Sequence, residues 1–500
     1  MTSDLSDAGE PAASRLRPGG YFSGGTGLLT DHYELTMLRG ALHSGVAERR
    51  AVFEVFARHL PSGRRYGVVA GTGRLLDALG SFRFGPAELD FLRETGVADD
   101  VTLRYLQAYS FSGDMWGYAE GDCYFPGSPI LVVEGTFAEA VVLETLALSI
   151  LNHDCAIASA ASRMVTAAGD RPLIEMGSRR THELAAVASA RAAYISGFAS
   201  TSNLRAGHDY GLPTSGTSAH SFTLLHDSER NAFSAQLAAL GPGTTLLADT
   251  YDVAAAVRTA VELAGPGLGA VRIDSGDLPV VAREVRALLD SLGAHKTRIV
   301  LTGDLDEYSI AALAATPVNG YGVGTSLVTG SGVPTAALVY KLVARADVTG
   351  TATGTGTGTG TGSGTATTAG TGSRTGAAAG TGPLRPVAKR SVGKPGRGGR
   401  KWAVRRLDAA GTAVAELIGD APPEPDPGHR ILLRHLVHGG EIIGREPVEA
   451  ARARHRAAKA ELPVHALRLS RGYPAIPTVF GPASHDPESH DPESYSPEGG

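Results

Sequence analysis

The chain has 500 residues, with 46 lysines and arginines against 51 aspartates and glutamates, and a formal net charge of -5. This length allows two or three domains with a large core. The near balance of charge argues against a nucleic-acid or polyanion binder, although it leaves room for a local basic pocket that takes phosphate.

The N-terminal part of the chain predicts a tail and then a first domain. Residues 1–20 carry several charges and no apolar stretch, so we expect a disordered tail and not a secretory signal. A helix is predicted to begin after Thr30 or Asp31, either of which can serve as its N-cap. Residues 51–58 alternate like a strand with one buried face. Residues 21–150 are therefore predicted to form an α+β domain.

The longest apolar region lies at the end of this domain. Residues 136–152 predict a long, mostly buried helix, and its apolar part, 137–151, is interrupted by Glu139 and Glu144. It falls short of the roughly 18 uninterrupted apolar residues that a membrane span requires. The two cysteines have neither disulfide nor metal-ligand spacing, which fits a reducing compartment. We therefore expect a soluble, cytoplasmic protein without a membrane partner.

Residues 151–345 alternate between short apolar runs and amphipathic, helix-like segments. This alternation predicts an α/β fold with a parallel sheet and right-handed crossovers. Fewer than eight strand–helix units are clear, so we expect an irregular, incomplete β/α barrel. Strands are predicted at 172–176, 244–249, 270–274, 298–302 and 320–323, and helices at 182–196, 253–264, 279–292 and 307–314. Four of these strands end on polar clusters, which predicts one shared site at the carboxyl edge of the barrel.

Two segments after the barrel have a low-complexity composition. Residues 346–383 are almost entirely Thr, Gly, Ala and Ser, and they predict a disordered surface insertion without a catalytic role. Residues 384–480 return to a folded composition and are expected to pack on the preceding domains. Residues 481–500 are acidic and proline-rich, which predicts a disordered tail, although its His485 and His490 could bind a metal.

The most distinctive candidate for chemistry is a histidine in a loop of small and hydroxyl residues. Residues 211–221 read Gly-Leu-Pro-Thr-Ser-Gly-Thr-Ser-Ala-His-Ser and contain His220 and Thr217. A backbone rich in glycine and serine can turn its N–H groups toward an anion. His220 could then act as a base, a ligand or a nucleophile toward a phosphoryl group. The alternative is a loop histidine bonded to local hydroxyls.

Arginines follow or end two of the predicted strands. Arg179 and Arg180 come just after one of them, where guanidinium groups could hold phosphate or carboxylate, the alternative being an ion pair with Glu183. On another strand, alternation places Arg272 and Asp274 on the same side. That pair could bind a ribose phosphate and its hydroxyls, or it could bind magnesium. The alternative is a buried structural salt bridge.

Glycine-rich turns close the last two strands of the predicted barrel, at Gly303-Asp304 and at Gly324-Thr325. Turns after the last strands of a barrel are the usual seat of a phosphate. A further basic set comes later, and residues 389–401 within it predict a mobile loop over a polyanionic substrate, the alternative being a solvated basic loop. The members of this set are Lys341, Lys389, Lys394, Arg397, Arg400 and Lys401.

Six motifs in one order carry a resemblance to a known family. They are Thr-Asp-x-Tyr at 30–33, Glu-x-Gly-x-Arg-Arg at 175–180, Gly-Phe-x-Ser-Thr-Ser-Asn at 197–203, Gly-Thr-x-Ala-His-Ser at 216–221, Asp-Thr-Tyr-Asp at 249–252 and Arg-x-Asp-Ser-Gly-Asp at 272–277. The series resembles that of the nicotinate phosphoribosyltransferases over residues 28–469, apart from the insertion.

The resemblance implies an activity and its cofactors. The expected reaction converts nicotinate and phosphoribosyl pyrophosphate to nicotinate mononucleotide and pyrophosphate, coupled to ATP hydrolysis, as the first step of NAD salvage from nicotinate. The resemblance also implies Mg²⁺, an irregular β/α barrel, and a homodimer whose active sites lie at the subunit interface.

The resemblance further implies a role for each matching residue. His220 would be transiently phosphorylated by ATP, and Tyr33 would stack on the pyridine ring from the partner subunit. Arg179 and Arg272 would hold nicotinate or the ribose phosphate, while Gly303, Asp304, Gly324 and Thr325 would seat the 5′-phosphate. Met176, Arg180, Ser200, Thr217 and Lys341 complete the expected substrate contacts, Lys389 and Lys394 are expected at ATP or pyrophosphate, and Asp274 and Asp277 at Mg²⁺.

Three features of the sequence bear on substrate choice and on departures from the family pattern. The window 197–203 holds hydroxyls and no acid, which favours a carboxylate-bearing substrate, nicotinate, over nicotinamide. Met176 stands where an aromatic residue is expected to stack on the ring, and Ala160 stands where a lysine is expected. The alternatives are a sister enzyme for quinolinate or nicotinamide, a non-catalytic binding relative, and an aldolase-like barrel, for which no predicted strand supplies a lysine.

Overall fold

The computed structural model describes residues 25–347, 382–389 and 396–481. The predicted disorder of residues 1–20, most of the 346–383 insertion, the tail after 481, and Lys394 lie outside the described residues. Two of the described sheets are antiparallel and include the C-terminal segment. The larger has the order β13 (Leu384–Pro386), β12 (Leu338–Ala346), β1 (Arg50–Ala57), β5 (Leu131–Thr136), β3 (Asp114–Tyr118), β17 (Leu433–His438) and β18 (Glu441–Ile442). The smaller has the order β16 (His429–Ile431), β14 (Trp402–Leu407), β15 (Ala413–Gly419) and β19 (Thr478–Phe480), β19 alone pairing in parallel.

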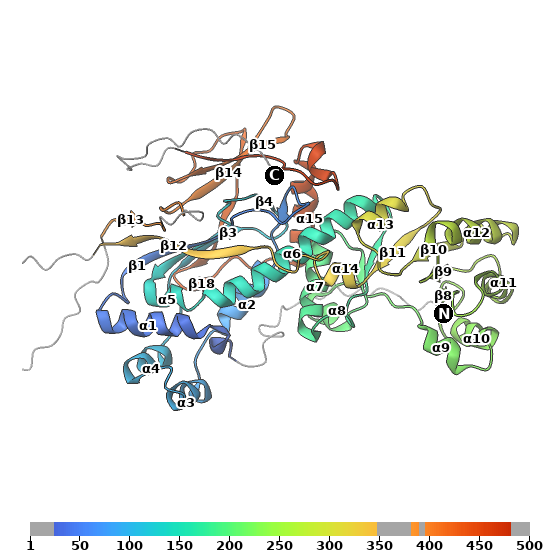
Figure 1. The fold of residues 1–500 in the computed structure, drawn as a ribbon, viewed down its shortest axis with the longest axis horizontal. Helices are drawn as coiled ribbons and strands as arrows, with labels where there is room; N and C mark the ends of the chain where they lie inside the picture. The colour runs from blue at the N-terminus through green and yellow to red at the C-terminus, as the bar shows by residue number, and fades with distance from the viewer. Residues whose placement is uncertain (1–24, 348–381, 390–395, 482–500) are drawn as a thin grey trace, which may run out of the picture.

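A parallel sheet forms the other end of the molecule (Figure 1). Its six strands have the order β7 (Ser200–Thr201), β6 (Leu173–Glu175), β11 (Gly320–Val323), β10 (Arg298–Leu301), β9 (Ala270–Ile273) and β8 (Thr245–Leu247). The sheet curls without closing, so the predicted incomplete barrel is confirmed. Five of its strands are the ones that the sequence predicts, and β7 was not predicted. A short ladder, β2 (Gly67–Val68) with β4 (Cys123–Tyr124), lies apart from it.

The helices fall into three groups along the chain. The first group is α1 (His32–Ser44), α2 (Thr72–Gly80), α3 (Pro86–Glu94), α4 (Asp100–Gln107), α5 (Phe137–Val141) and α6 (Glu144–Ala168). The second is α7 (Glu183–Ile195), α8 (Leu204–Tyr210), α9 (His220–Leu225), α10 (Glu229–Leu240), α11 (Val253–Ala264), α12 (Leu278–Ser291), α13 (Glu307–Ala312) and α14 (Thr325–Val328). The last is α15 (Val448–Ala460). Asp31 caps α1 by accepting the His32 N–H, as the sequence predicts.

The predicted helix over 136–152 is two helices. Thr136 caps α5 with a capping box that includes Glu139, and α6 then begins at Glu144 and runs on to Ala168. By length and composition the stretch Phe137–Ala168 could cross a membrane, but 67% of its most apolar window is buried in the protein. The first half of α6 packs into the N-terminal core and its second half into the core of the parallel sheet. The helix therefore joins the two halves of the molecule.

Strand β1 is buried on both faces, so the prediction of one buried face was wrong. Phe53 stacks on Tyr340 and lies beside Phe137 on one face. On the other face Glu54 pairs with Lys401, which the C-terminal segment brings from far along the chain. The segment that covers the second face of β1 is distant in the sequence, so the periodicity of the strand cannot reveal it.

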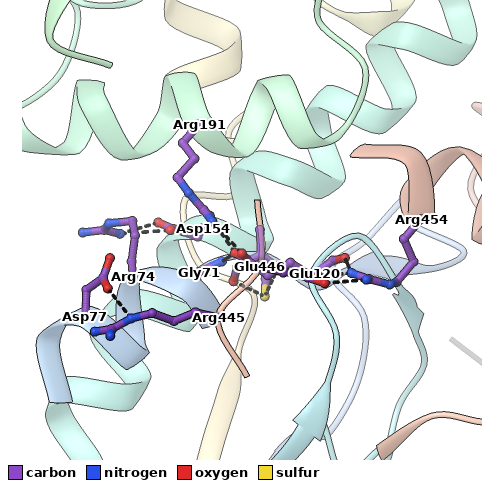
Figure 2. A network of polar contacts seen from close by, with 11 residues as sticks. Gly71, Arg74, Asp77, Glu120, Asp154, Arg191, Arg445, Glu446 and Arg454 are labelled. Carbon is purple, nitrogen blue, oxygen red and sulfur yellow. Dashed lines mark hydrogen bonds and ion pairs between the residues drawn. The ribbon is translucent and has the colours of Figure 1, made fainter. Parts of the chain in front are cut away.

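A buried polar network ties α7 to the N-terminal domain and to α15 (Figure 2). Arg191 on α7 donates from both terminal nitrogens to the two carboxylate oxygens of Glu120, each at 2.6 Å. The same carboxylate accepts the Gly71 N–H that precedes α2, and the Glu120 carbonyl accepts from Arg454 on α15. Nearby, Arg74 on α2 binds Asp154 on α6. These hydrogen bonds and ion pairs fix α2, α6, α7 and α15 relative to one another beside the parallel sheet.

Candidate active site

The site lies at the carboxyl ends of the parallel strands, where the sequence predicts it. Asp249 and Thr250 follow β8, Asp274 follows β9, Thr302 follows β10, and His220 is the first residue of α9. Because these strands are parallel neighbours, their carboxyl ends meet at one edge of the sheet. Four separate segments thus contribute to one cluster.

Arg272 is the centre of this cluster, and it is largely buried. Its Nε donates to the Thr302 hydroxyl at 2.9 Å, and one terminal nitrogen donates to the Thr217 hydroxyl at 2.8 Å. The other terminal nitrogen contacts the Asp274 carboxylate at 3.1 Å. Alternation along β9 therefore places Arg272 and Asp274 on the same side, as predicted. These contacts hold the guanidinium rigidly at the sheet edge, where it can attract an anion.

Asp274 is held as a carboxylate. Burial alone would raise its pKa, but hydrogen bonding from the Thr302 hydroxyl and the charge of Arg272 outweigh burial and lower the pKa below its usual value. A carboxylate that stays ionised at neutral pH can accept from ribose hydroxyls or bind a cation.

His220 faces a second carboxylate, that of Asp249. The His220 Nε2 lies 3.9 Å from Asp249 Oδ1, and its Nδ1 lies 3.1 Å from the Thr250 hydroxyl. Asp249 is almost fully buried, and its Oδ2 accepts from the Asp274 N–H and the Ser275 hydroxyl. Its Oδ1 is buried and has no hydrogen-bond partner among the residues that the structure describes. A distance of 3.9 Å is too long for a hydrogen bond, so the negative charge of Asp249 acts on the ring through space, while Nδ1 faces the Thr250 hydroxyl.

Close packing at the sheet edge requires two glycines. A Cβ on Gly322 would lie 2.6 Å from both the Met176 Sδ and the Thr302 Cγ2, so Met176 lies directly over the centre of the sheet edge. Gly303 has φ +110°, and a Cβ there would lie 2.4 Å from the Asp274 carbonyl oxygen. The next residue, Asp304, also has positive φ, at 48°. This tight turn brings Gly303 and Asp304 beside Asp274.

Several of the residues that the sequence predicts to contact the substrate lie along the carboxyl edge of the parallel sheet. Arg179 and Arg180 are exposed just beyond β6, and neither has an ion-pair partner among the described residues. The alternative of an ion pair with Glu183 is therefore not found there. Ser200 is half-buried on β7, and Gly324 precedes α14, which begins at the exposed Thr325. These groups are free to meet a ligand.

Glu175 has a structural role beneath this edge. It is fully buried, and its carboxylate accepts from the Thr201 hydroxyl and the Gly177 N–H. Burial raises the pKa of Glu175 above its usual value, although both hydrogen bonds lower it in part. The Thr201 hydroxyl in the window 197–203 is thus already engaged, which leaves Ser200 as a hydroxyl open to a substrate.

Two residues that are predicted to contact the substrate, Tyr33 and Lys341, lie far from the carboxyl edge of the parallel sheet. Tyr33 is half-exposed on α1, and the Lys341 ammonium lies 3.6 Å from the Glu144 carboxylate. Burial, Glu144 and Glu34 raise the pKa of Tyr33 well above its usual value. Figure 1 shows α1 far from α9 along the long axis of the molecule. A single chain therefore does not bring Tyr33 or Lys341 to His220.

Two members of the later basic set do not belong to a mobile loop, and the prediction was wrong for them. The buried Lys401 ammonium donates to Glu54 at 2.9 Å. Arg400 donates to Glu134 at 2.9 Å and covers the Trp402 ring at 3.5 Å from its centre. Both cations fasten the C-terminal segment to the N-terminal sheet, because each meets a carboxylate from a distant strand. Lys389 is exposed.

Asp277 and Ala160 also have local structural roles. The Asp277 carboxylate caps α12 by accepting the Val280 N–H at 3.3 Å. Ala160 is fully buried in α6 and contributes no polar group to the sheet edge.

The sequence reasoning missed the roles of Asp249, Thr250 and Thr302 as site residues. Asp249 and Thr302 end predicted strands, Thr250 directly follows one, and Asp249 opens the Asp-Thr-Tyr-Asp motif. The position of a polar residue at a strand end was the available signal. What it could not show is that the Asp249 carboxylate would point at His220.

Comparisons with known proteins identify related chains. A family model described as the nicotinate phosphoribosyltransferase N-terminal domain matches residues 28–152. The chain is 54% identical over 486 residues to the nicotinate phosphoribosyltransferase pncB1 of Mycobacterium tuberculosis (strain CDC 1551 / Oshkosh), with 95% of this chain and 100% of that protein covered.

Solved structures share the fold. Human nicotinic acid phosphoribosyltransferase superposes with a TM-score of 0.73 at 25% identity, over 91% of this chain and 98% of that one. Nicotinate-nucleotide pyrophosphorylase from Pyrococcus furiosus gives a TM-score of 0.67 at 21% identity, over 87% of this chain and 95% of that one. The second likeness concerns the fold alone.

Proposed function

The chain belongs to the nicotinate phosphoribosyltransferase family, and from this premise we propose that it forms nicotinate mononucleotide and pyrophosphate from nicotinate and phosphoribosyl pyrophosphate. The observation that carries the proposal is the cluster of Arg272, Asp274 and His220 at the open edge of the parallel sheet. It combines a fixed cation, an ionised carboxylate and a histidine backed by a carboxylate. We further propose that the reaction is coupled to ATP and serves NAD salvage.

The arrangement around His220 supports a phosphohistidine step. A His220 tautomer with its proton on Nε2, toward the charge of Asp249, would leave the Nδ1 electron pair to attack the γ-phosphorus of ATP. A nitrogen–phosphorus bond then forms while the bond to the ADP oxygen breaks. Asp249 stabilises the positive charge that develops on the ring. The side chain of His220 is 41% exposed, so a nucleotide can reach it.

Phosphorylated His220 would add about two negative charges near Arg272 and Asp274. Such a charge can order the exposed Arg179 and Arg180 around the pyrophosphate of the second substrate, whereas Lys389, which follows β13 at the opposite end of its own chain, would have to come from the partner subunit. These cations would then stabilise the charge on the leaving pyrophosphate as the ribose carbon becomes oxocarbenium-like.

The carboxylates of this edge fit Mg²⁺, which prefers oxygen ligands and keeps several waters. The buried Asp249 Oδ1 has no hydrogen-bond partner, and Asp274 is ionised beside it. We propose that Asp274 holds Mg²⁺ with Asp249 nearby, whereas Asp277 is engaged as a helix cap. When bound, Mg²⁺ would neutralise phosphate charge and orient the pyrophosphate for departure.

The substrate assignment is tested by product formation from phosphoribosyl pyrophosphate and Mg²⁺ with nicotinate, nicotinamide or quinolinate, each with and without ATP. We expect ATP-stimulated mononucleotide from nicotinate only. Nicotinamide should give at least about 100-fold less, because its amide N–H groups meet no acid at Ser200 and the exposed arginines lose a carboxylate partner. Turnover of quinolinate would identify the sister enzyme, and no turnover with any of the three would favour a binding protein.

We propose that the active enzyme is a homodimer in which Tyr33 completes the site of the partner subunit. Tyr33 and Met37 are exposed on α1, Leu28 and Leu29 are exposed just before that helix, and α1 is far from α9 in its own chain. Free, buried Cys123 and Cys155 agree with a cytoplasmic location, where thiols stay reduced.

The dimer is tested by mixing two inactive variants, Tyr33→Ala and His220→Ala, under conditions of subunit exchange. A shared site predicts that mixed dimers regain one intact site in two, which gives about a quarter of the parent activity after random pairing. Co-purification of one variant with the other, only one of which carries an affinity tag, shows that exchange has occurred. Full activity of a monomeric species, or no recovery after demonstrated exchange, would contradict a shared site.

A further inference from the structure

A second polar cluster lies at the N-terminal end of the molecule, far from the parallel sheet. Asp114 on β3 accepts from His435 Nε2 and from His438 Nδ1, each at 3.0 Å. The three potential ligand atoms all lie within 4.8 Å of one another. Figure 1 places β3 and β18, which flank β17 in the sheet, well away from α9, so this cluster is separate from the candidate active site.

The backbone is built to bring both histidines to one face of the sheet. In a regular strand, residues three apart point to opposite faces. Strand β17 has a bulge here, because His435 pairs with Trp116 while Val437 pairs with the next residue, Met115. The extra residue returns His438 to the face of His435. The Gly439 N–H then donates to the Asp114 carboxylate at 3.1 Å, which fixes that carboxylate at the turn.

Neighbouring groups hold the first imidazole in place. His435 stacks on Trp116 with ring centres 4.0 Å apart and an angle of 4° between the planes. Trp402 packs edge-on against Trp116, with the two ring centres 5.1 Å apart and an angle of 68° between the planes. The cluster opens into a hollow of about 480 Å³ that these two tryptophans line. Rigid ligands beside an open volume are typical of metal sites that keep a free position.

We propose that Asp114, His435 and His438 form a binding site for a divalent late transition metal, with Zn²⁺ as the expected ion. One carboxylate and two imidazoles are donors that Zn²⁺ accepts. The contacts of 3.0 Å between Asp114 and each ring nitrogen are near the roughly 3.3 Å that donors have in a tetrahedral site with bonds of 2.0–2.1 Å. His438 is 71% exposed, so the ion can enter, and a fourth position faces the hollow.

The chain provides its own reporter for this site. Its two tryptophans are Trp116 and Trp402, and both lie in the hollow. Titration of untagged, chelator-treated enzyme with Ni²⁺ is therefore expected to quench most of the tryptophan fluorescence, with one ion bound per chain. Zn²⁺ should displace Ni²⁺ and restore the signal, because it has no unpaired electrons, whereas Mg²⁺ should not compete.

Two variants test the ligands separately. His438→Gln and Asp114→Asn should each weaken Ni²⁺ and Zn²⁺ binding at least about tenfold, since loss of even an outer partner of a metal ligand costs that much. Circular dichroism checks that both are folded, and nicotinate turnover should stay at the parent level. His208→Gln is the matched control, because His208 is also paired with a neighbouring carboxylate at 2.8 Å, but no second histidine among the described residues joins that pair. It should bind like the parent.

Two results would overturn the site. The first is the absence of quenching by Ni²⁺ at concentrations up to a millimolar. The second is quenching that His438→Gln and Asp114→Asn leave unchanged, which would place the ion elsewhere. A His485→Gln/His490→Gln variant identifies the C-terminal tail as that other location if it alone abolishes binding. The proposal does not depend on the transferase activity, so either assignment can fail without the other.

Discussion

Replacing His220 with alanine is expected to abolish the stimulation of the transferase by ATP and to leave at most slow, ATP-independent transfer. The variant loses the Nδ1 electron pair that Thr250 contacts and the ring that Asp249 orients. Without a phosphorylated residue, ATP has no covalent means of changing the affinity for phosphoribosyl pyrophosphate. We expect the ATP-stimulated rate to fall at least about 100-fold, in line with the loss of a catalytic group.

The measurement is the initial rate with and without ATP, together with transfer of label from γ-labelled ATP to the protein. His226→Ala is the matched control, because His226 follows the same short helix but its Nδ1 contacts the Phe222 carbonyl at 2.8 Å. It should keep both the label and the stimulation. Full ATP stimulation in His220→Ala would refute the assignment of the phosphorylated residue, and label on another residue would locate the true one.

Replacing Arg191 with methionine is expected to destabilise the protein by about 3–5 kcal/mol, because it leaves a buried carboxylate without its partner. Both Arg191 and Glu120 are almost fully buried, and the two hydrogen bonds between them are 2.6 Å long (Figure 2). The same carboxylate also accepts the Gly71 N–H, so an uncompensated charge there affects the start of α2 as well as α7.

Urea unfolding followed by circular dichroism measures this effect. Arg230→Met is the matched control, since Arg230 and Glu262 make the same two-pronged contact on the surface, and water replaces it. Its unfolding midpoint should barely move. The double variant Arg191→Met/Glu120→Gln should recover part of the loss because the buried charge is gone. Equal shifts for Arg191→Met and Arg230→Met would show that the buried pair does not stabilise the fold.

The strands and helices around the active site were predictable because their signals are local. Alternation along 270–274 placed Arg272 and Asp274 on one side, and β11 and α11 have the predicted bounds. Short segments such as β7 and α9 were not predicted, since two to six residues give too little periodicity to recognise.

The fate of the charged residues was decided by packing between distant segments. The sequence predicts that Arg400 and Lys401 belong to a basic loop. In the structure each contacts a carboxylate from a strand more than two hundred residues earlier in the chain. Tyr33 matches the family motif, but one chain leaves it far from His220. Residue type gives no information on such partners, because the energy of a buried charge depends on which opposite charge the fold brings to it.

The sequence by itself determined the fold class, the family and the set of residues at the strand ends, since periodicity and motif order act within short stretches. Only the tertiary structure decided that the unpartnered oxygen of Asp249 faces His220, and that Asp114 meets two histidines from β17. In both cases the groups come from separate segments. Their meeting depends on strand order, on a one-residue bulge and on helix placement, all of which are set by the packing of the whole chain.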